Sequence, residues 1–169
     1  KRKIGLVFQD YTLFPHLTVY QNIAFGMRQK NKKDRIQAIL KMVELEEDTK
    51  KYPYECSGGM QQRIALARAI ANQPKLLLFD EPFSNLDPIH KAIIKSVIQD
   101  IGEQLKITCM MVSHEAADTL SWADVIVVMK DGQIVQSGTP REIYSNPADE
   151  YCAALFGEYN IVDKKDFFT

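Results

Sequence analysis

The sequence has little of what marks a membrane-spanning, secreted or nucleic-acid-binding protein. Its formal net charge is −1, from 21 Lys and Arg against 22 Asp and Glu, so no bulk positive field attracts nucleic acid or an anionic membrane. No apolar run approaches the ~20 residues that a helix needs to cross a bilayer. No signal peptide opens the chain. Any membrane role is therefore expected to come through a partner.

Cysteine is also scarce. Cys56, Cys109 and Cys152 are odd in number and lack a C-x-x-C pairing, which argues against a disulfide framework or a zinc site and indicates a reducing compartment. With 169 residues, 46% of them hydrophobic, the chain is expected to form one globular domain with a substantial core. It starts at Lys1 rather than at Met, and we expect it to be a piece of a longer polypeptide.

One short apolar stretch is followed directly by two carboxylates. Residues 76–79 are too few for a helix and are typical of a strand buried on both faces of a parallel sheet. Asp80 and Glu81 follow, and Pro82 stops the strand. The carboxyl ends of strands line the ligand crevice in open α/β sheets, where one carboxylate can hold a metal while the other activates water. An acidic turn without function is the alternative for this stretch taken alone.

Strands and helices alternate around this stretch and predict an α/β fold. Further buried strands are expected at 4–8 and 108–112, and a hairpin at 125–136 turns on Asp131-Gly132, a type I′ pair. Capping boxes predict helix starts at Thr18 and Thr139. Helices are expected from Thr18 to about Gln29, from Asp34, from Ser57 to about Asn72, from Pro88 to about Lys106, at 115–120, from Pro140 and at 148–156. In the helix that starts at Pro88, the residues expected to face the core are Ile89, Ile93, Val97, Ile101 and Leu105. The absence of strands between the first helices predicts a small helical subdomain at about 18–72.

Polar residues gather at the strand ends and helix starts of this layer. Ser57-Gly58-Gly59 opens a helix, where glycine lets a phosphate approach the backbone and free N–H groups face it. Gln9 and His114 each follow a predicted strand. Taken singly, each has an ordinary interpretation: a serine N-cap beside glycine, or a structural histidine.

Taken together, these motifs resemble those of the ATP-binding cassette (ABC) ATPases over nearly the whole chain. The matching pieces are V-F-Q at 7–9 (the Q-loop), C-S-G-G-M-Q-Q-R at 56–63 (the signature), L-L-L-F-D-E-P at 76–82 (Walker B), S-N-L-D at 84–87 (the D-loop) and V-S-H at 112–114 (the switch). The resemblance implies a P-loop NTPase-like fold: a mostly parallel sheet, flanking helices and an inserted helical subdomain. Cys56 and Met60 depart from the usual signature, but the S-G-G that faces phosphate is intact.

The resemblance also implies ATP and Mg²⁺ as cofactors and a role for each matching residue. Asp80 is implied to hold Mg²⁺ with Gln9, and Glu81 to act as the general base toward water. His114 is implied to contact the γ-phosphate. The residues implied to act across a head-to-tail dimer, on ATP held by a second subunit, are Ser57, Gly58, Gly59, Gln61 and the D-loop Asp87.

The sequence contains no G-x-x-x-x-G-K-[ST] phosphate loop, the Walker A motif that precedes the Q-loop in this family, nor the family's N-terminal β-subdomain. We therefore expect the chain as given to bind ATP poorly and to hydrolyse almost none. In the family the phosphate-loop strand pairs with the strand that ends at the switch. We accordingly expect the 108–112 edge to be open to dimerisation or aggregation.

The segments 14–26 and 138–147 are similar to the importer branch, in particular to ATPases for ferric-iron, polyamine, sulfate or thiamine uptake. Such a subunit lies on the cytoplasmic face of the membrane, bound to a permease. The permease would dock at the Q-loop and helical subdomain, with Leu13, Phe14 and Leu17 as candidate contacts rather than core residues. Two other hypotheses are a non-transport ABC ATPase of translation or DNA repair and a non-enzymatic fragment that binds partners.

Overall fold

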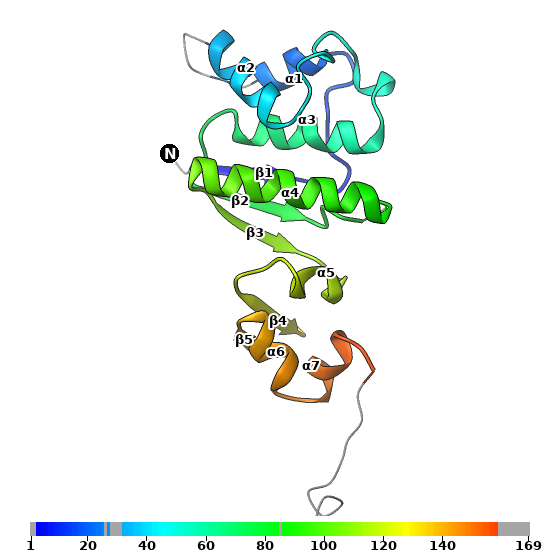
Figure 1. The fold of residues 1–169 in the computed structure, drawn as a ribbon, viewed down its shortest axis with the longest axis vertical. Helices are drawn as coiled ribbons and strands as arrows, with labels where there is room; N and C mark the ends of the chain where they lie inside the picture. The colour runs from blue at the N-terminus through cyan, green and yellow to red at the C-terminus, as the bar shows by residue number, and fades with distance from the viewer. Residues whose placement is uncertain (1–2, 26, 28–31, 85, 159–169) are drawn as a thin grey trace, which may run out of the picture. The chain divides into compact units, whose positions relative to one another are not determined.

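The computed structural model describes residues 3–25, 27, 32–84 and 86–158 (Figure 1). The chain divides into two compact units, Lys1–Ser113 and His114–Thr169. The first unit contains β1 (Ile4–Val7), α1 (Val19–Ala24), α2 (Lys32–Met42), the 3-10 turn η1 (Pro53–Glu55), α3 (Gly58–Ile70), β2 (Leu76–Asp80), α4 (Pro88–Leu105) and β3 (Thr108–Val112). The second contains α5 (Ala116–Leu120), β4 (Ile126–Lys130), β5 (Gln133–Gly138), α6 (Pro140–Ser145) and α7 (Glu150–Leu155).

The first unit is built on a parallel sheet with the strand order β1-β2-β3. In its register Ile4 lies opposite Leu76, and Leu76 lies opposite Thr108. Both expected outer strands therefore pair with the strand that ends in the two carboxylates. The prediction of a parallel α/β sheet is confirmed.

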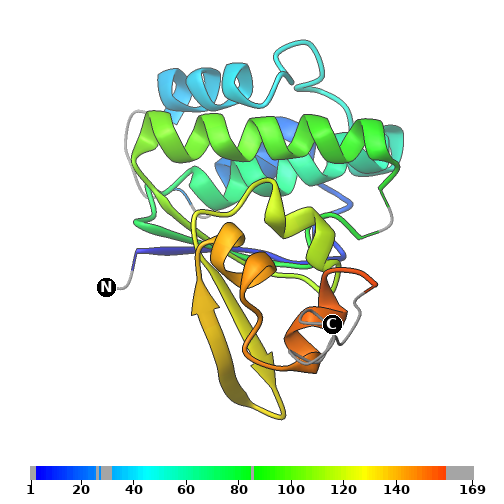
Figure 2. The ribbon, with the colours of Figure 1, turned by 60° about the horizontal axis from the view of Figure 1, so that its bottom comes forward.

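Helices α3 and α4 cover one face of this sheet (Figure 2), and α1 and α2 lie beyond α3 (Figure 1). Leu77 and Phe79 face the helices and are 0% and 3% exposed. Gly5 permits the close approach of α3, because a Cβ there would lie 2.9 Å from the carbonyl oxygen of Ala69.

The strand residues that alternate with those facing the helices are less buried than the sequence predicts. Ile4 is 46% exposed and Met110 is 57% exposed, whereas we expected these strands to be buried. The prediction that β1 and β3 are buried strands was wrong for these residues, because the helices of this unit that the structure describes cover only one face of the sheet.

The first helices form where their caps predict. Thr18 and Gln21 make the expected capping box at the start of α1, and the apolar residues predicted for the next helix are buried: Ile36, Ile39, Leu40 and Val43. Two boundaries differ. Helix α1 ends at Ala24 instead of near Gln29, which lies outside the described residues, and α2 already begins at Lys32, inside the predicted loop.

The buried stripe of α4 differs from the predicted one. Asp87 caps the helix and Pro88 opens it as expected, but Ile89 is 73% exposed. A helix turns about 100° per residue, so a series spaced by four residues drifts about 40° at each step and leaves one face. The buried residues instead follow the three- and four-residue spacing of a single face: Ile94, Val97, Ile98 and Ile101.

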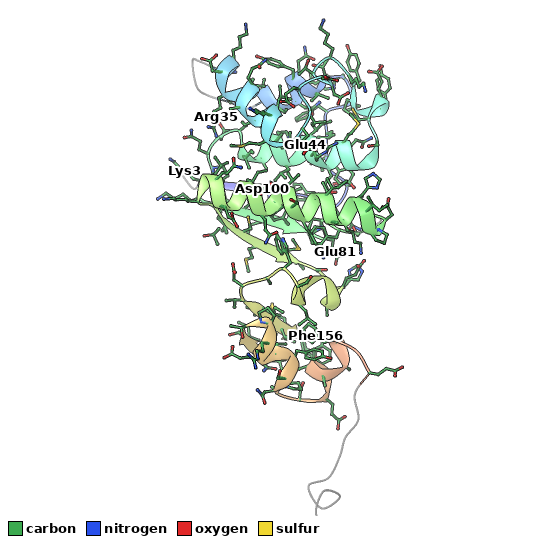
Figure 3. All side chains as sticks on the ribbon, viewed as in Figure 1. Lys3, Arg35, Glu44, Glu81, Asp100 and Phe156 are labelled. Atoms are coloured by element: carbon green, nitrogen blue, oxygen red, sulfur yellow. The ribbon has the colours of Figure 1, made fainter. Side chains whose placement is uncertain are left out.

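Arg35 of α2 caps the C-terminal end of α3 (Figure 3). Its Nε donates a hydrogen bond to the carbonyl oxygen of Ala71 at 2.9 Å, and its Nη2 donates to that of Ile70 at 3.1 Å. A cation suits this end of the helix dipole, and the last carbonyls of a helix have no intrahelical donor. Burial lowers the pKa of Arg35 from its ordinary value.

Removing this cap should destabilise the first unit. We expect Arg35→Ala to lower the free energy of unfolding by about 1–2 kcal/mol, because two carbonyls lose a charged donor. Chemical denaturation of the variant measures the effect. Lys33→Ala is the matched control, since Lys33 is an exposed cation of the same helix. Equal denaturation midpoints for Arg35→Ala and Lys33→Ala would contradict the capping role of Arg35.

The second unit is a hairpin packed against two short helices. Strands β4 and β5 are antiparallel, and Asp131 and Gly132 both have the positive φ, 50° and 76°, that the type I′ turn requires. Thr139 and Glu142 form the expected capping box of α6. Helix α7 starts two residues later than predicted, with Asp149 as its N-cap. The core residues are Ile126, Val128, Ile143 and Cys152.

Among the helices that the structure describes, none combines the length and apolar character that spanning a bilayer requires.

Candidate functional site

The central strand β2 delivers two carboxylates to the carboxyl edge of the sheet. Asp80 is its last residue and is exposed. Glu81 follows with a φ of 50°, in the left-handed region that residues other than glycine rarely adopt. Its N–H donates to the carbonyl oxygen of Val112 at 3.0 Å. Its own carbonyl accepts from Ser84, from the Oγ at 2.8 Å and from the N–H at 3.2 Å. The backbone of Glu81 is thus fixed from both sides.

Gln9 reaches the same edge from β1. Val7, the last residue of β1, lies opposite Phe79, so Gln9 follows its strand by two residues as Glu81 follows Phe79. The side chain of Gln9 is exposed. Figure 3 shows Lys3 and Glu81 at opposite ends of the strands, as a parallel arrangement requires. The structure therefore brings Gln9, Asp80 and Glu81 to one edge of the sheet.

The loop after Gln9 has two further left-handed residues, Tyr11 and Thr12, with φ of 59° and 43°. Arg68 of α3 holds both: its Nη1 donates to the carbonyl oxygen of Thr12 at 2.7 Å and its Nη2 to that of Tyr11 at 3.0 Å. Burial lowers the pKa of Arg68 from its ordinary value. Nothing in the sequence indicates this role, because Arg68 looks like any other polar residue of an amphipathic helix.

The Ser57-Gly58-Gly59 loop caps α3 as predicted. The Oγ of Ser57 accepts from the N–H of Met60 at 3.3 Å. A Cβ at Gly58 would have no neighbour within 4 Å, so this backbone is open to an approaching group. Gln61 turns toward its own chain instead, with its Nε2 donating to the carbonyl oxygens of Pro53 and Cys56 at 2.9 and 3.2 Å.

Asp87 caps α4 and pairs with a histidine on its first turn. Its Oδ1 accepts from the N–H groups of Ile89 and His90 at 3.0 and 3.1 Å, and its Oδ2 lies 2.5 Å from Nδ1 of His90. The imidazole also contacts the signature, since a Cβ at Gly59 would lie 3.1 Å from its Cδ2. Asn85 of the D-loop lies outside the described residues.

A pocket of about 160 Å³ lies where α3 and α4 begin. Its lining residues are Glu44, Ser57, Gly59, Met60, Arg63, His90, Ile93 and Ile94. The pocket joins the signature loop to the first turns of α4, which begins at the D-loop aspartate.

The residues at the sheet edge suit Mg²⁺ better than a metal held by protein alone. The described part of the chain has no group of three His, Cys, Asp or Glu able to hold a metal ion. Mg²⁺ commonly takes one or two protein carboxylates and completes its shell with water and substrate phosphate. An exposed Asp80 beside Gln9 fits that pattern.

His114 is the first residue of the second unit and is exposed. It follows β3 after Ser113, as the sequence predicts for the switch position.

The hydrogen bonds at Asp87 predict a pH effect on stability. The backbone and then the side-chain hydrogen bond with His90 lower the pKa of Asp87. A lowered folded-state pKa stabilises the fold above the unfolded value of about 3.9, and this stabilisation is lost as the pH falls through the folded-state value. We expect Asp87→Asn to weaken the fall in melting temperature in this acid range, which thermal melts from pH about 5 to about 2 would measure. Asp100→Asn, at an exposed carboxyl of α4, is the control; parallel curves for both variants would refute the assignment.

Comparison with known proteins gives one family. A family model described as ABC transporter matches residues 1–84. The spermidine/putrescine import ATP-binding protein PotA of Vibrio cholerae is 43% identical over 166 residues, which are 95% of this chain and 44% of that protein. The protein of the same name from Thermotoga maritima is 39% identical, over 96% of this chain and 45% of its own length. The chain thus spans a little under half the length of these relatives.

A solved structure has the same fold. The chain of cbiO1 from Clostridium perfringens, described as part of the ABC transporter complex cbiONQ, matches with a TM-score of 0.79 and 31% identity. The match covers 86% of this chain and 61% of that one. The similarity to these relatives does not favour the hypothesis of a non-transport ABC ATPase of translation or DNA repair.

Proposed function

We propose, since this chain belongs to the ABC transporter ATPase family, that it forms part of the ATP-hydrolysing subunit of a solute importer. The observation that carries the proposal is the carboxyl edge of the sheet. There Asp80 ends the central strand and Glu81 follows it, Gln9 lies two residues beyond the end of the neighbouring strand, and hydrogen bonds hold the Glu81 backbone.

The two carboxylates divide the work. Asp80, with Gln9, would hold Mg²⁺, which would neutralise charge on the phosphates of ATP. Glu81 accepts a proton from water and orients it toward the γ-phosphate. His114 donates to that phosphate as its charge rises.

The signature and D-loop serve the second ATPase subunit of a head-to-tail dimer. Ser57, Gly58 and Gly59 offer backbone N–H groups and a helix start to a γ-phosphate. Gly58 is suited to this because no described atom would lie within 4 Å of a Cβ there. Gln61 supports the loop through its bonds to Pro53 and Cys56. Asp87 carries the signal between subunits through His90 and Gly59.

The permease docks on the segment that follows the Q-loop. Leu13, Phe14 and Leu17 are each half-buried, so part of each side chain remains open to a partner. The Phe14 ring lies 4.2 Å from the ring of Phe25, which is 53% exposed. Such a site holds the protein at the cytoplasmic face of the membrane. The helical subdomain at about 18–72 supplies the rest of the docking surface.

The test is hydrolysis by the protein as its gene encodes it, reconstituted with its permease. We expect ATP hydrolysis that depends on Mg²⁺ and is lost with EDTA, together with solute uptake that stops when ATP is withheld. Spermidine is the first solute to try, because the relatives named above are spermidine/putrescine import proteins. Hydrolysis unaffected by EDTA would contradict the role of Asp80. Hydrolysis without any binding to a permease would favour a non-transport ATPase.

A further inference from the structure

We infer that Gln62 is a positioning residue for Glu81: its amide, projecting from the signature helix, holds the peptide next to the proposed general base. This inference rests on the function proposed above. Gln62 is 2% exposed, and its Nε2 donates a hydrogen bond to the carbonyl oxygen of Pro82. Pro82 directly follows Glu81, so a side chain of α3 is bonded to the turn that carries the carboxylate.

Stability alone does not explain a glutamine at this position. The Oε1 of Gln62 is buried and has no hydrogen-bond partner among the described residues. A buried polar atom without a partner destabilises the fold and offsets what the one hydrogen bond of the amide contributes. An apolar residue of similar size would fill the same space without that penalty. The feature that only the amide supplies is a directed bond to the Pro82 carbonyl.

The backbone at Glu81 needs such an anchor. A non-glycine residue in the left-handed region is strained and persists only where its surroundings hold it. Val112 holds the N–H of Glu81, and Ser84 holds its carbonyl. Pro82 has no N–H to offer, so its carbonyl is the next backbone group that can be held. Gln62 bonds to that group.

The anchor also ties the general base to the signature of the same chain. Gln62 lies on α3 five residues after its cap Ser57, about 7.5 Å along the helix axis. Ser57 acts on one ATP of the dimer and Glu81 on the other. A shift of α3 when the signature engages phosphate would therefore reach Glu81 through this one bond. Displacing a catalytic group by about 1 Å can change a rate about 10²-fold.

The experiment compares Gln62→Met with the wild type in the full-length protein. Methionine keeps the length of the side chain but cannot donate. We expect kcat for ATP hydrolysis to fall about 10- to 100-fold, with KM for ATP changed by less than about twofold, because a misplaced base affects the chemical step alone. The lifetime of the ATP-bound dimer should lengthen in proportion. Gln104→Met is the matched control, since Gln104 is exposed on α4.

A second variant separates positioning from folding. In Gln62→Glu the neutral acid can donate to the Pro82 carbonyl, whereas the ionised carboxylate cannot. Its kcat relative to wild type should therefore fall as the pH rises from about 6 to about 8, because burial raises the pKa of a carboxyl. A ratio that does not change with pH would overturn the inference. So would Gln62→Met with wild-type kcat, or one whose KM rises as much as its kcat falls.

A structural readout distinguishes this inference from the function on which it rests. Hydrogen exchange at the Glu81 and Ser84 N–H groups should be faster in Gln62→Met than in Gln104→Met. If the wild type hydrolyses no ATP, the proposed function fails, and exchange still decides whether Gln62 holds this turn. Unchanged exchange at both groups would remove the positioning role in either case.

Discussion

Glu81→Gln is expected to lower kcat for ATP hydrolysis by about 10²- to 10⁴-fold, the usual contribution of a positioned general base. The amide has the shape of the carboxylate but cannot take a proton from water. The fold should be preserved, because the hydrogen bonds that hold this residue are made by its backbone N–H and carbonyl. Steady-state hydrolysis by the full-length protein with Mg²⁺ measures the loss. ATP affinity should change little, since the carboxylate is proposed to act on water.

Glu103→Gln provides the matched control for this loss of negative charge. Glu103 is exposed near the C-terminal end of α4, away from the carboxyl ends of the strands. We expect it to hydrolyse ATP like the wild type. If Glu81→Gln retained more than about a tenth of the wild-type kcat, Glu81 would not be the general base.

Asn22→Ala is expected to destabilise the first unit by about 3–5 kcal/mol. The side chain is completely buried, and its Nδ2 donates to the carbonyl oxygens of Phe14, Leu17 and Thr18 at 3.1, 2.9 and 3.1 Å. Its Oδ1 accepts from the N–H of Phe14 at 2.9 Å. Each of these bonds contributes about 1 kcal/mol. Alanine would remove the bonds to the Phe14 N–H and to the Leu17 carbonyl, whereas the carbonyls of Phe14 and Thr18 would keep the N–H groups of Leu17 and Asn22 as donors. The proposed docking segment at 13–17 would lose its shape with the removed bonds.

Urea denaturation and permease binding test this expectation separately. Gln37→Ala is the control, because Gln37 is exposed on α2. We expect Asn22→Ala to unfold at a much lower urea concentration and to bind the permease more weakly at temperatures where the rest of the unit stays folded. If the urea midpoints of Asn22→Ala and Gln37→Ala agreed within experimental error, water would be replacing the hydrogen bonds of the Asn22 side chain, and the expectation would be wrong.

The parts of the fold that the sequence predicted are those with a local cause. The capping boxes at Thr18 and Thr139, the cap at Asp87 and the Asp131-Gly132 turn all formed where their residues indicated. Each depends on bonds within a few residues, so tertiary context had little chance to override it. The buried stripe of α4 was misplaced because it depends on which face meets α3 and the sheet, a long-range property.

The candidate site divides in the same way. The residue types and their positions at strand ends were visible in the motifs, because a parallel sheet must bring its carboxyl ends to one edge. The residues that hold those strand ends in place were not visible in the motifs. Gln62, Arg68 and Asn22 make their bonds to backbone carbonyls, which have no identity in the sequence. A glutamine, an arginine or an asparagine inside a helix gives no sign of which distant turn it holds.

The pairing of β1 with β2 has a consequence for the order of folding. Ile4 can pair with Leu76 only after the whole helical region between them has been synthesised. By contrast, β2 and β3 are joined by a crossover that contains a single helix. Contacts between distant residues form late, because closing the longer loop costs more entropy. We expect β2, α4 and β3 to assemble first and β1 to join afterwards. During synthesis, the strand that leads to Gln9 would emerge among the first residues of this segment and be among the last to dock.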